Sequence, residues 1–322
     1  MAEPLAVVTA AAPNYLAQVR VLARSFRRHH AAPFYAFLAG DGEAERRLRD
    51  LDVRIVSIRT LRAPGLAGML LRYGPKQFCA AIKPALLLSL LDLGHQTAVF
   101  LDPDLYVADT LKPCLAEAAA HSLTLTPHIG PESLVLADEP LERSLLMAGM
   151  FNAGFVAVRE GSEARAFLQW WIERLRTQCY EDPRQGIHFD QRWLDLAPGY
   201  VADLHLLRDP GCNAGYWRLG EAAWDPQAGR FLICGRPLRL FHFSGYDPQR
   251  PSLVTRYRPG WRVDSLGPLQ RLFELYQRLL LEEGWREHSR RPWPWGDAWL
   301  AWEAARRLRR AVRTARRMLR GA

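Results

Sequence analysis

The chain has 322 residues, 49% of them apolar, and a formal net charge of +9, as expected of a soluble globular protein with an ample core. It contains no apolar run of 18 residues, and its Met-Ala-Glu-Pro start lacks the features of a signal peptide, so we expect a cytoplasmic protein. Five widely spaced cysteines without a Cys-x-x-Cys pair argue against a disulfide framework and a zinc site.

The first part of the chain alternates between apolar runs and helical periodicity. Strands are predicted over residues 5–10, 33–38 and 53–58, and helices over residues 16–26 and 43–51. A strand, a turn and a helix in this order form the first half of a nucleotide-binding α/β unit. The fold class predicted from this alternation is α/β.

The next segment is rich in glycine and proline. We therefore expect residues 63–75 to form a loop that could act as a lid. A helix is predicted over residues 78–93, with Lys83 in its first turns. Lysine is rare in this chain, since only Lys76, Lys83 and Lys112 occur, so each is less expected to be a generic surface residue. Further helices are predicted at 110–120 and 162–177, with an edge strand at 123–126.

The most informative stretch is Thr-Ala-Val-Phe-Leu-Asp-Pro-Asp-Leu-Tyr-Val at residues 97–107. An apolar run that ends at Asp102 and Asp104 predicts a buried strand with two carboxylates at its carboxyl end, where open α/β sheets hold their ligands. A divalent cation would relieve the repulsion between the two carboxylates. Solvated turn aspartates and an aspartyl-nucleophile phosphatase are the alternatives, and Tyr106 fits the phosphatase pattern poorly.

Polar residues interrupt three later apolar segments. Asn152 follows Phe151 at the start of a predicted strand, where an asparagine either caps a turn or holds a ligand hydroxyl. Asp190 and Gln191 interrupt residues 188–194, and a strand over residues 238–245 contains His242. A lone histidine is more often a core residue, but an imidazole with two carboxylates is a reasonable Mn²⁺ ligand set.

Together these pieces resemble the retaining glycosyltransferases of the GT-A fold, in particular the glycogenin and lipopolysaccharide galactosyltransferase family, glycosyltransferase family 8. The resemblance covers roughly residues 5–250 and implies a GT-A-like mixed sheet flanked by helices, in a domain that we expect to span residues 1–290. It rests on Ala10 with Asn14-Tyr15, Lys83, Leu101-Asp102-Pro103-Asp104, Phe151-Asn152-Ala153-Gly154 with Asp190-Gln191, and His242-Phe243-Ser244-Gly245.

The resemblance implies a role for each piece. Asp102, Asp104 and His242 would bind Mn²⁺ or Mg²⁺, and Asp190 or Gln191 would lie nearest the anomeric carbon of the transferred sugar. The remaining donor-binding residues would be Ala10, Asn14, Tyr15, Lys83, Asn152, Ala153, Gly245 and Arg250. Two departures from the family pattern concern the donor: Ala12 replaces an aspartate near the base, and the diphosphate-binding lysine is missing, with Arg250 as a displaced substitute.

The chain changes in character after residue 290. Trp293, Trp295, Trp299 and Trp302 precede a pattern with Leu and Ala on one face and arginines on the other, and residues 296–322 carry a net charge of +6 from eight arginines and two acids. This pattern favours a basic amphipathic helix at residues 291–322 that lies on an anionic membrane surface, at the inner face of the cytoplasmic membrane. A helix packed on the body and a nucleic-acid-binding helix are the alternatives.

The sequence thus predicts a metal-dependent glycosyltransferase that moves a sugar from a nucleotide-diphosphate donor, a UDP-sugar, to a glycan or lipid-linked acceptor with retention of configuration. One alternative is a sugar-nucleotide nucleotidyltransferase, but residues 9–15 lack the glycine and the cation of its phosphate loop. A second alternative is a non-enzymatic protein that binds nucleotide sugars or nucleic acid, but this alternative assigns no function to the Asp-x-Asp strand and Asp190. We expect no nucleic-acid partner.

Overall fold

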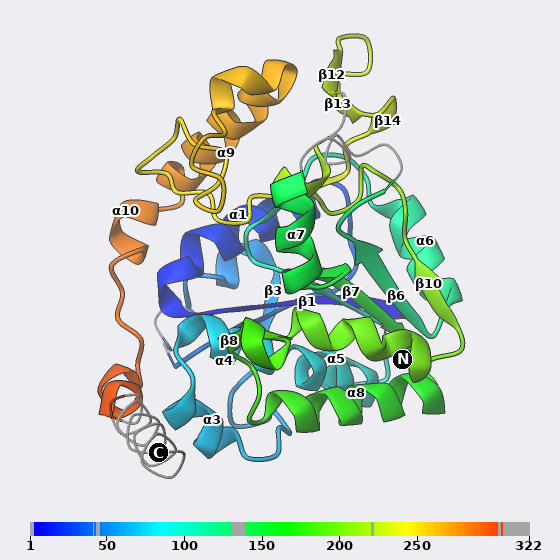
Figure 1. Ribbon diagram of the computed structural model, residues 1–322, viewed down its shortest axis with the longest axis vertical. Helices are drawn as coiled ribbons and strands as arrows, with labels where there is room; N and C mark the ends of the chain where they lie inside the picture. Colours follow the sequence, from blue (N-terminus) through cyan, green and yellow to red (C-terminus); the bar gives the residue numbers. More distant parts are fainter. Residues whose placement is uncertain are drawn as a thin grey trace, which may run out of the picture.

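In a computed structural model of the chain, a seven-stranded sheet runs through the middle of the molecule (Figure 1). The structure describes residues 3–40, 42, 46–130, 139–219, 222–301 and 304. The strand order is β10-β6-β7-β4-β1-β2-β3. In chain order these strands are β1 (Leu5–Ala11), β2 (Phe34–Leu38), β3 (Val53–Ile55), β4 (Thr97–Leu101), β6 (Leu123–Pro127), β7 (Phe151–Arg159) and β10 (Leu204–Leu206).

The sheet is mixed, as the sequence predicted. Strands β1, β2, β3 and β4 run parallel to one another, whereas β7 is antiparallel to both β4 and β6. Strand β4 lies between β1 and β7, and all five of its residues are buried. The chain leaves this central strand at Asp102, so the Asp-x-Asp segment lies at the middle of the carboxyl edge of the parallel strands.

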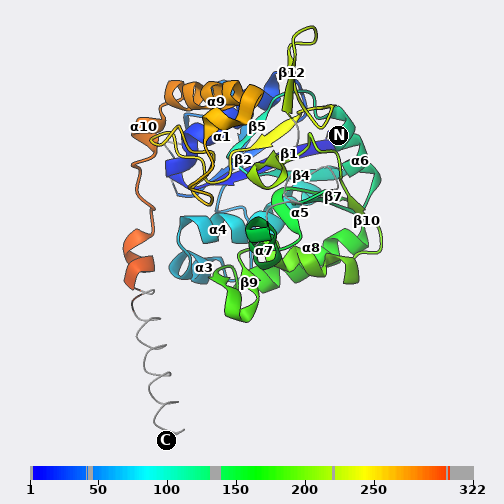
Figure 2. The same ribbon diagram turned by 45° about the horizontal axis from the view of Figure 1, so that its top comes forward.

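Helices cover both faces of the sheet (Figure 2). One core joins Val8 and Phe100 to α4 (Pro75–Ala81), α5 (Lys83–Asp92) and α8 (Ser162–Leu175). The other core joins Val7 and Val99 to α1 (Leu16–Arg27) and α6 (Lys112–Ala120). Because successive side chains of a strand point to opposite faces, neighbouring residues of β1 and β4 enter different cores.

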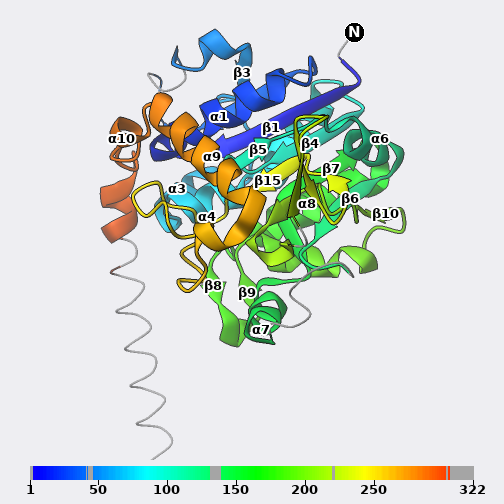
Figure 3. The same ribbon diagram turned by 90° about the horizontal axis from the view of Figure 1, so that it is seen from above.

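A second, three-stranded sheet carries His242. It consists of β11 (Ala214–Gly215), β15 (Leu240–His242) and β5 (Leu105–Val107), with β15 antiparallel to β5. Helix α9 (Gln270–Glu282) covers this sheet (Figure 3). The rings of Phe243 and Tyr276 stack with a centroid distance of 3.7 Å. Since β5 follows the Asp-x-Asp segment directly, its pairing with β15 brings His242 to the two aspartates.

The other elements are short. They are α3 (Leu66–Arg72), α7 (Glu139–Ala148), α10 (Trp285–His288), the strands β8 (Glu181–Asp182), β9 (Ile187–His188), β12 (Ala222–Asp225), β13 (Arg230–Ile233) and β14 (Arg236–Pro237), and the 3-10 turns η1 (Pro13–Tyr15), η2 (Arg49–Leu51), η4 (Pro183–Gln185), η5 (Gln191–Gly199), η6 (Tyr216–Arg218) and η7 (Val263–Leu269).

Three sequence predictions about these elements were wrong. Residues 66–72 form helix α3, although glycines and prolines on both sides had indicated a loop. The helix predicted over residues 78–93 is two helices, interrupted at Ile82, because Pro84 lacks an N–H and its ring excludes a continuous helix across that point. Strand β6 is not an edge strand, since β10 pairs with its outer side.

The tryptophan-rich segment lies along the body of the molecule. The rings of Trp293 and Trp295 lie 5.6 and 6.1 Å from the ring of Phe78 in α4, and both side chains pack against the core beside α4. These two tryptophans, which we had expected as membrane anchors, are thus partly buried on the protein. Residues 296–301 are helical, and the arginine-rich part of the predicted C-terminal helix lies outside the described residues. None of the helices in the described part combines the length and apolar character that crossing a bilayer requires.

Candidate active site

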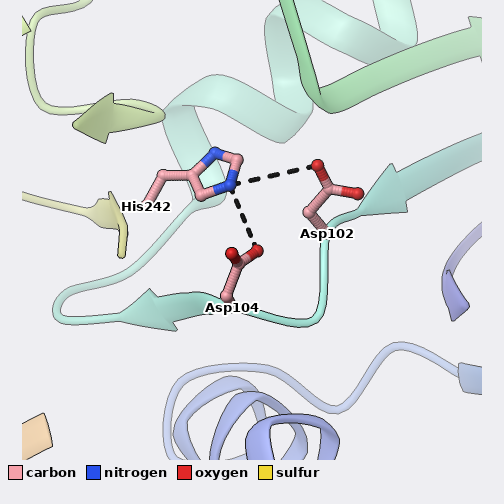
Figure 4. A group of neighbouring side chains, drawn as sticks. All are labelled: Asp102, Asp104 and His242. Atoms are coloured by element: carbon pink, nitrogen blue, oxygen red, sulfur yellow. Dashed lines mark ion pairs between the residues drawn. The ribbon is translucent and has the colours of Figure 1, made fainter. Parts of the chain in front are cut away.

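Asp102, Asp104 and His242 converge as the sequence predicted (Figure 4). The Nε2 atom of His242 lies 3.1 Å from Asp104 Oδ1 and 3.9 Å from Asp102 Oδ2. One ligand atom from each of the three side chains lies within 4.8 Å of the others. The two carboxylates come from the turn between β4 and β5, and the imidazole comes from the end of β15.

Lys83 connects this cluster to Asp190. Its Nζ atom lies 2.9 Å from Asp102 Oδ1 and 2.9 Å from Asp190 Oδ2, and it donates a hydrogen bond of 3.1 Å to the carbonyl oxygen of Ala153. The ammonium thus forms ion pairs with two carboxylates and a hydrogen bond with one backbone carbonyl. Lys83 is the first residue of helix α5, directly after the break at Ile82, and is only 5% exposed.

The buried charges shift one another's pKa values. Burial lowers the pKa of the Lys83 ammonium, but the charges of Asp102 and Asp190 more than reverse this effect, and the net pKa is raised. Burial raises the pKa of Asp102, against the opposing effects of Lys83 and His242. Burial also opposes ionisation of Asp104, yet the charge and hydrogen bond of His242 outweigh it and lower the pKa.

The donor set fits a divalent cation. When Asp102, Asp104 and Asp190 are ionised and His242 is neutral, three negative charges stand against the positive charge of Lys83, which leaves an excess of two negative charges among these side chains. Two carboxylate oxygens and one imidazole nitrogen suit Mn²⁺, and carboxylates alone also suit Mg²⁺. A cation of charge +2 held by the three predicted ligands would therefore balance the site.

Asp190 and Gln191 follow a strained residue. Phe189 has a φ of +49°, which is unusual for a bulky side chain, and its N–H donates to the Tyr180 carbonyl at 2.9 Å. Asp190 is buried beside Lys83. Gln191 accepts from the Ala153 N–H at 3.3 Å and donates to the Ala148 carbonyl at 3.0 Å, so backbone groups hold both ends of its amide.

Asn152 lies in a buried hydrogen-bond network. Its Oδ1 atom accepts from the backbone N–H of Gly154 at 2.8 Å and from Nδ2 of Asn213 at 2.9 Å. Gly154 is required here for space, because a Cβ atom at this position would lie 2.5 Å from the ring of His242. The sequence did not reveal Asn213, which lies in a bend directly before β11.

The residues predicted around the nucleotide lie at the end of β1. Ala10 is buried in that strand, Asn14 is partly exposed in the turn η1, and Tyr15 follows it. Burial and then the Asp104 carboxylate raise the pKa of the Tyr15 hydroxyl, so Tyr15 lies near the Asp102-Asp104-His242 cluster.

The structure distinguishes two arginines near the predicted diphosphate position. Arg250 is exposed, and its side chain forms no hydrogen bond or ion pair with the described residues. Arg256 was not singled out from the sequence, but its backbone N–H donates to the Gly245 carbonyl at 3.0 Å. Its charge acts on both Tyr15 and Asp104. Only the folding of the loop after Gly245 brings Arg256 back to this region.

The comparisons with known sequences find distant relatives. No family model matches the chain. The chain is 26% identical to the uncharacterized protein YfnF of Bacillus subtilis over 213 residues, which make up 63% of this chain and 67% of YfnF. It is 28% identical to the uncharacterized protein YfnD of the same organism over 180 residues, which make up 53% of this chain and about half, 54%, of YfnD.

The comparisons with solved structures define the class of fold, which is the GT-A fold of glycosyltransferases. An active-site variant of LgtC aligns with a TM-score of 0.52 at 19% identity, over 88% of this chain and 99% of LgtC. The glycosyltransferase GlyE of Streptococcus pneumoniae aligns with a TM-score of 0.50 at 15% identity, over 90% of this chain and 65% of GlyE. The fold predicted by the resemblance to this group is confirmed.

Proposed function

We propose that the protein is a metal-dependent glycosyltransferase that transfers a sugar from a nucleotide-diphosphate donor, a UDP-sugar, to a glycan or lipid-linked acceptor with retention of configuration. The observation that carries the proposal is the convergence of Asp102, Asp104 and His242 at the carboxyl edge of a GT-A-type sheet. The ammonium of Lys83 and the carboxylate of Asp190 next to this cluster support it further.

The chemistry of sugar transfer suits this charge pattern. When the bond between the sugar and the diphosphate breaks, negative charge grows on the leaving phosphate and positive charge grows on the sugar ring. Mn²⁺ or Mg²⁺ bound by the three ligands would stabilise the leaving phosphate as a Lewis acid. Arg256 or Arg250 would add a further positive charge on the diphosphate side.

Asp190 is the better of the two predicted catalytic residues. Its carboxylate is buried and lies 2.9 Å from the Lys83 ammonium, and a carboxylate can stabilise a positively charged sugar ring or attack it. Backbone groups already occupy both ends of the Gln191 amide. We therefore assign the stabilisation of the sugar to Asp190 and the positioning of the Ala153 segment to Gln191.

The remaining assignments concern binding. Ala10, Asn14 and Tyr15 would surround the base and ribose, with the Tyr15 ring stacked on the base. Asn152 and Ala153 would border the transferred sugar, and Gly245 would lie against the diphosphate, where its φ of +73° and the close approach of Tyr257 exclude a side chain. The pair of single variants Arg250→Ala and Arg256→Ala will show which arginine contributes to donor affinity.

A donor screen tests the proposal directly. Thermal-shift measurements with nucleotides and nucleotide sugars, each with and without Mn²⁺, should detect the donor because a ligand selective for the folded state stabilises it. Release of nucleoside diphosphate from the selected donor should then require the metal. Full turnover in the presence of EDTA would contradict the metal-dependent assignment.

Variants of the metal ligands sharpen the test. Asp102→Asn and Asp104→Asn should lower kcat/KM by on the order of 10²–10³-fold, because each removes one preorganised charge that stabilises the transition state. Asp52→Asn is the matched control: Asp52 is an exposed residue in a turn with φ +50°, a conformation that asparagine also tolerates. Activity near the wild-type level in either ligand variant would refute the assignment.

A further inference from the structure

The imidazole of His242 must present the correct nitrogen to serve as a metal ligand. Only a deprotonated ring nitrogen binds a cation, and the atom that faces Asp102 and Asp104 is Nε2. The proton of the neutral ring must therefore reside on Nδ1. We infer that Asn213 is the positioning residue that enforces this arrangement, an inference that rests on the proposed metal-dependent function.

The backbone N–H of Gly154 determines the orientation of the Asn152 amide. The N–H of Gly154 can only donate, and it lies 2.8 Å from one atom of the Asn152 amide, so this atom must be the oxygen. The amide nitrogen of Asn152 then faces His128 Nε2 at 3.3 Å and Gln191 Oε1 at 3.4 Å, both of which can accept. The orientation of Asn152 is thereby determined without reference to His242.

Asn152 in turn determines the orientation of Asn213. The side-chain oxygen of Asn152 can only accept, so the group of Asn213 that lies 2.9 Å from it must be the amide nitrogen. The same nitrogen donates to the hydroxyl of Thr126 at 2.7 Å. The oxygen of the Asn213 amide is therefore the atom that faces His242 Nδ1, at 3.1 Å.

The amide oxygen of Asn213 determines which nitrogen of His242 carries the hydrogen. An amide oxygen cannot donate, so Nδ1 of His242 must carry a hydrogen, and in the neutral ring the lone pair lies on Nε2. In an imidazolium ring Nδ1 keeps the same hydrogen, and a metal ion replaces only the hydrogen on Nε2. Asn213 thus acts on His242 as outer-shell partners act on metal-binding histidines in general.

Burial makes this arrangement difficult to replace. Asn213 is 1% exposed and His242 is 4% exposed, so bulk water has little access to substitute for a lost amide. Asn213 also has a φ of +57°, a left-handed conformation that asparagine adopts more readily than most residues. The ring of Trp217 lies edge-on to that of His242 with a centroid distance of 5.1 Å, which restricts rotation of the imidazole.

The same amide connects the metal ligand to the predicted sugar site. One end of Asn213 holds His242 and the other holds Asn152, which we assign to the border of the transferred sugar. Asn213 therefore fixes the distance between the cation and the sugar pocket, in addition to selecting the tautomer. Loss of its side chain should weaken both sites together.

The first experiment uses the wild-type protein. Nitrogen-15 NMR of labelled histidine, with His242 assigned by comparison with His242→Gln, should show the hydrogen on Nδ1 in the absence of metal. A neutral His242 ring with its hydrogen on Nε2 would overturn the inference, whether or not the protein proves to be a glycosyltransferase.

The second experiment measures Mn²⁺ binding by electron paramagnetic resonance. Asn213→Gly removes the side chain and suits the left-handed backbone, and we expect its Mn²⁺ affinity to fall about 10–100-fold. Asn213→Asp keeps an acceptor for Nδ1, so it should lose less than about tenfold. Asp52→Gly, which relieves a similar φ of +50° in an exposed turn, should bind as wild type does.

The outcomes separate this inference from the proposed function. Wild-type Mn²⁺ affinity in a folded Asn213→Gly protein would refute the positioning role even if the wild type is an active glycosyltransferase. A wild-type protein that binds no Mn²⁺ would refute the proposed metal site itself. If Asn213→Gly fails to fold, the Asp variant and the tautomer of the wild-type histidine still decide the question.

Discussion

Replacing Lys83 by methionine tests the charge arrangement of the site most directly. Methionine has a similar length but no charge, so Lys83→Met leaves the partly buried Asp102 and the buried Asp190 without the ammonium that lies 2.9 Å from each. Breaking a buried ion pair by removing one partner costs about 3–5 kcal/mol, because the remaining charge is uncompensated. For a chain of this length, with an unfolding entropy of about 2.1 cal/mol/K per residue, the expected decrease in Tm is about 4–7 °C.

The measurement is chemical and thermal denaturation in EDTA and again in Mn²⁺. A cation at Asp102 replaces part of the missing charge, so the loss of stability should be smaller in Mn²⁺ than in EDTA. Lys112→Met is the control, because Lys112 is exposed in helix α6. An unfolding free energy of Lys83→Met within about 1 kcal/mol of wild type in EDTA would refute the idea that Lys83 compensates two buried carboxylates.

A double-mutant cycle can isolate the pairing. Asp190→Asn removes the charge that Lys83 faces on the side of the sugar. If the two residues interact, the double variant with Lys83→Met should be less destabilised than the sum of the single variants, by about 0.5–3 kcal/mol. Additive effects would show that Lys83 and Asp190 are not energetically coupled.

Three further predictions concern other parts of the molecule. Gly154→Ala should lower both Tm and Mn²⁺ affinity, because the added Cβ atom would lie 2.5 Å from the His242 ring. Gly161→Ala should change neither, because a Cβ atom added there meets no other atom within 4 Å. Burial, then the charges of His29 and Lys112, lower the pKa of His30 from 6.5 to about 4, and its Nε2 accepts from the Leu111 N–H. The unfolded chain therefore binds the proton first, and stability should fall by roughly 1–2 kcal/mol as the pH decreases from 6.5 to 4. In pH-dependent melts His30→Gln should flatten this dependence, and His29→Gln, which removes only a secondary cause of the shift, should reduce it less. Deletion of residues 296–322 should release the protein from liposomes of anionic lipid, and unchanged binding would contradict a membrane role of the C-terminal segment.

The sequence by itself determined the central strands and the candidate metal ligands. Apolar runs that end at polar residues are local signals, and they indicated β1, β4 and β7 together with the carboxylates of Asp102 and Asp104. Because Asp102 and Asp104 follow a buried strand, the general rule that α/β sheets hold ligands at the carboxyl edge indicated that they belong to a binding site. The sequence and the resemblance to a known family predicted that His242 joins these two aspartates, whereas the pairing of β5 with β15 that brings it there came from the structure.

The tertiary structure alone decided how the site residues are held. The partners of Lys83, the return of Arg256 to the region of Tyr15 and the role of Asn213 depend on contacts between segments far apart in the chain. Hydrogen-bond direction is likewise a property of the assembled network, because each amide is oriented by the neighbour that it meets. A local sequence pattern indicates which residue types are present, whereas the packed fold determines which of them are in contact and through which atoms.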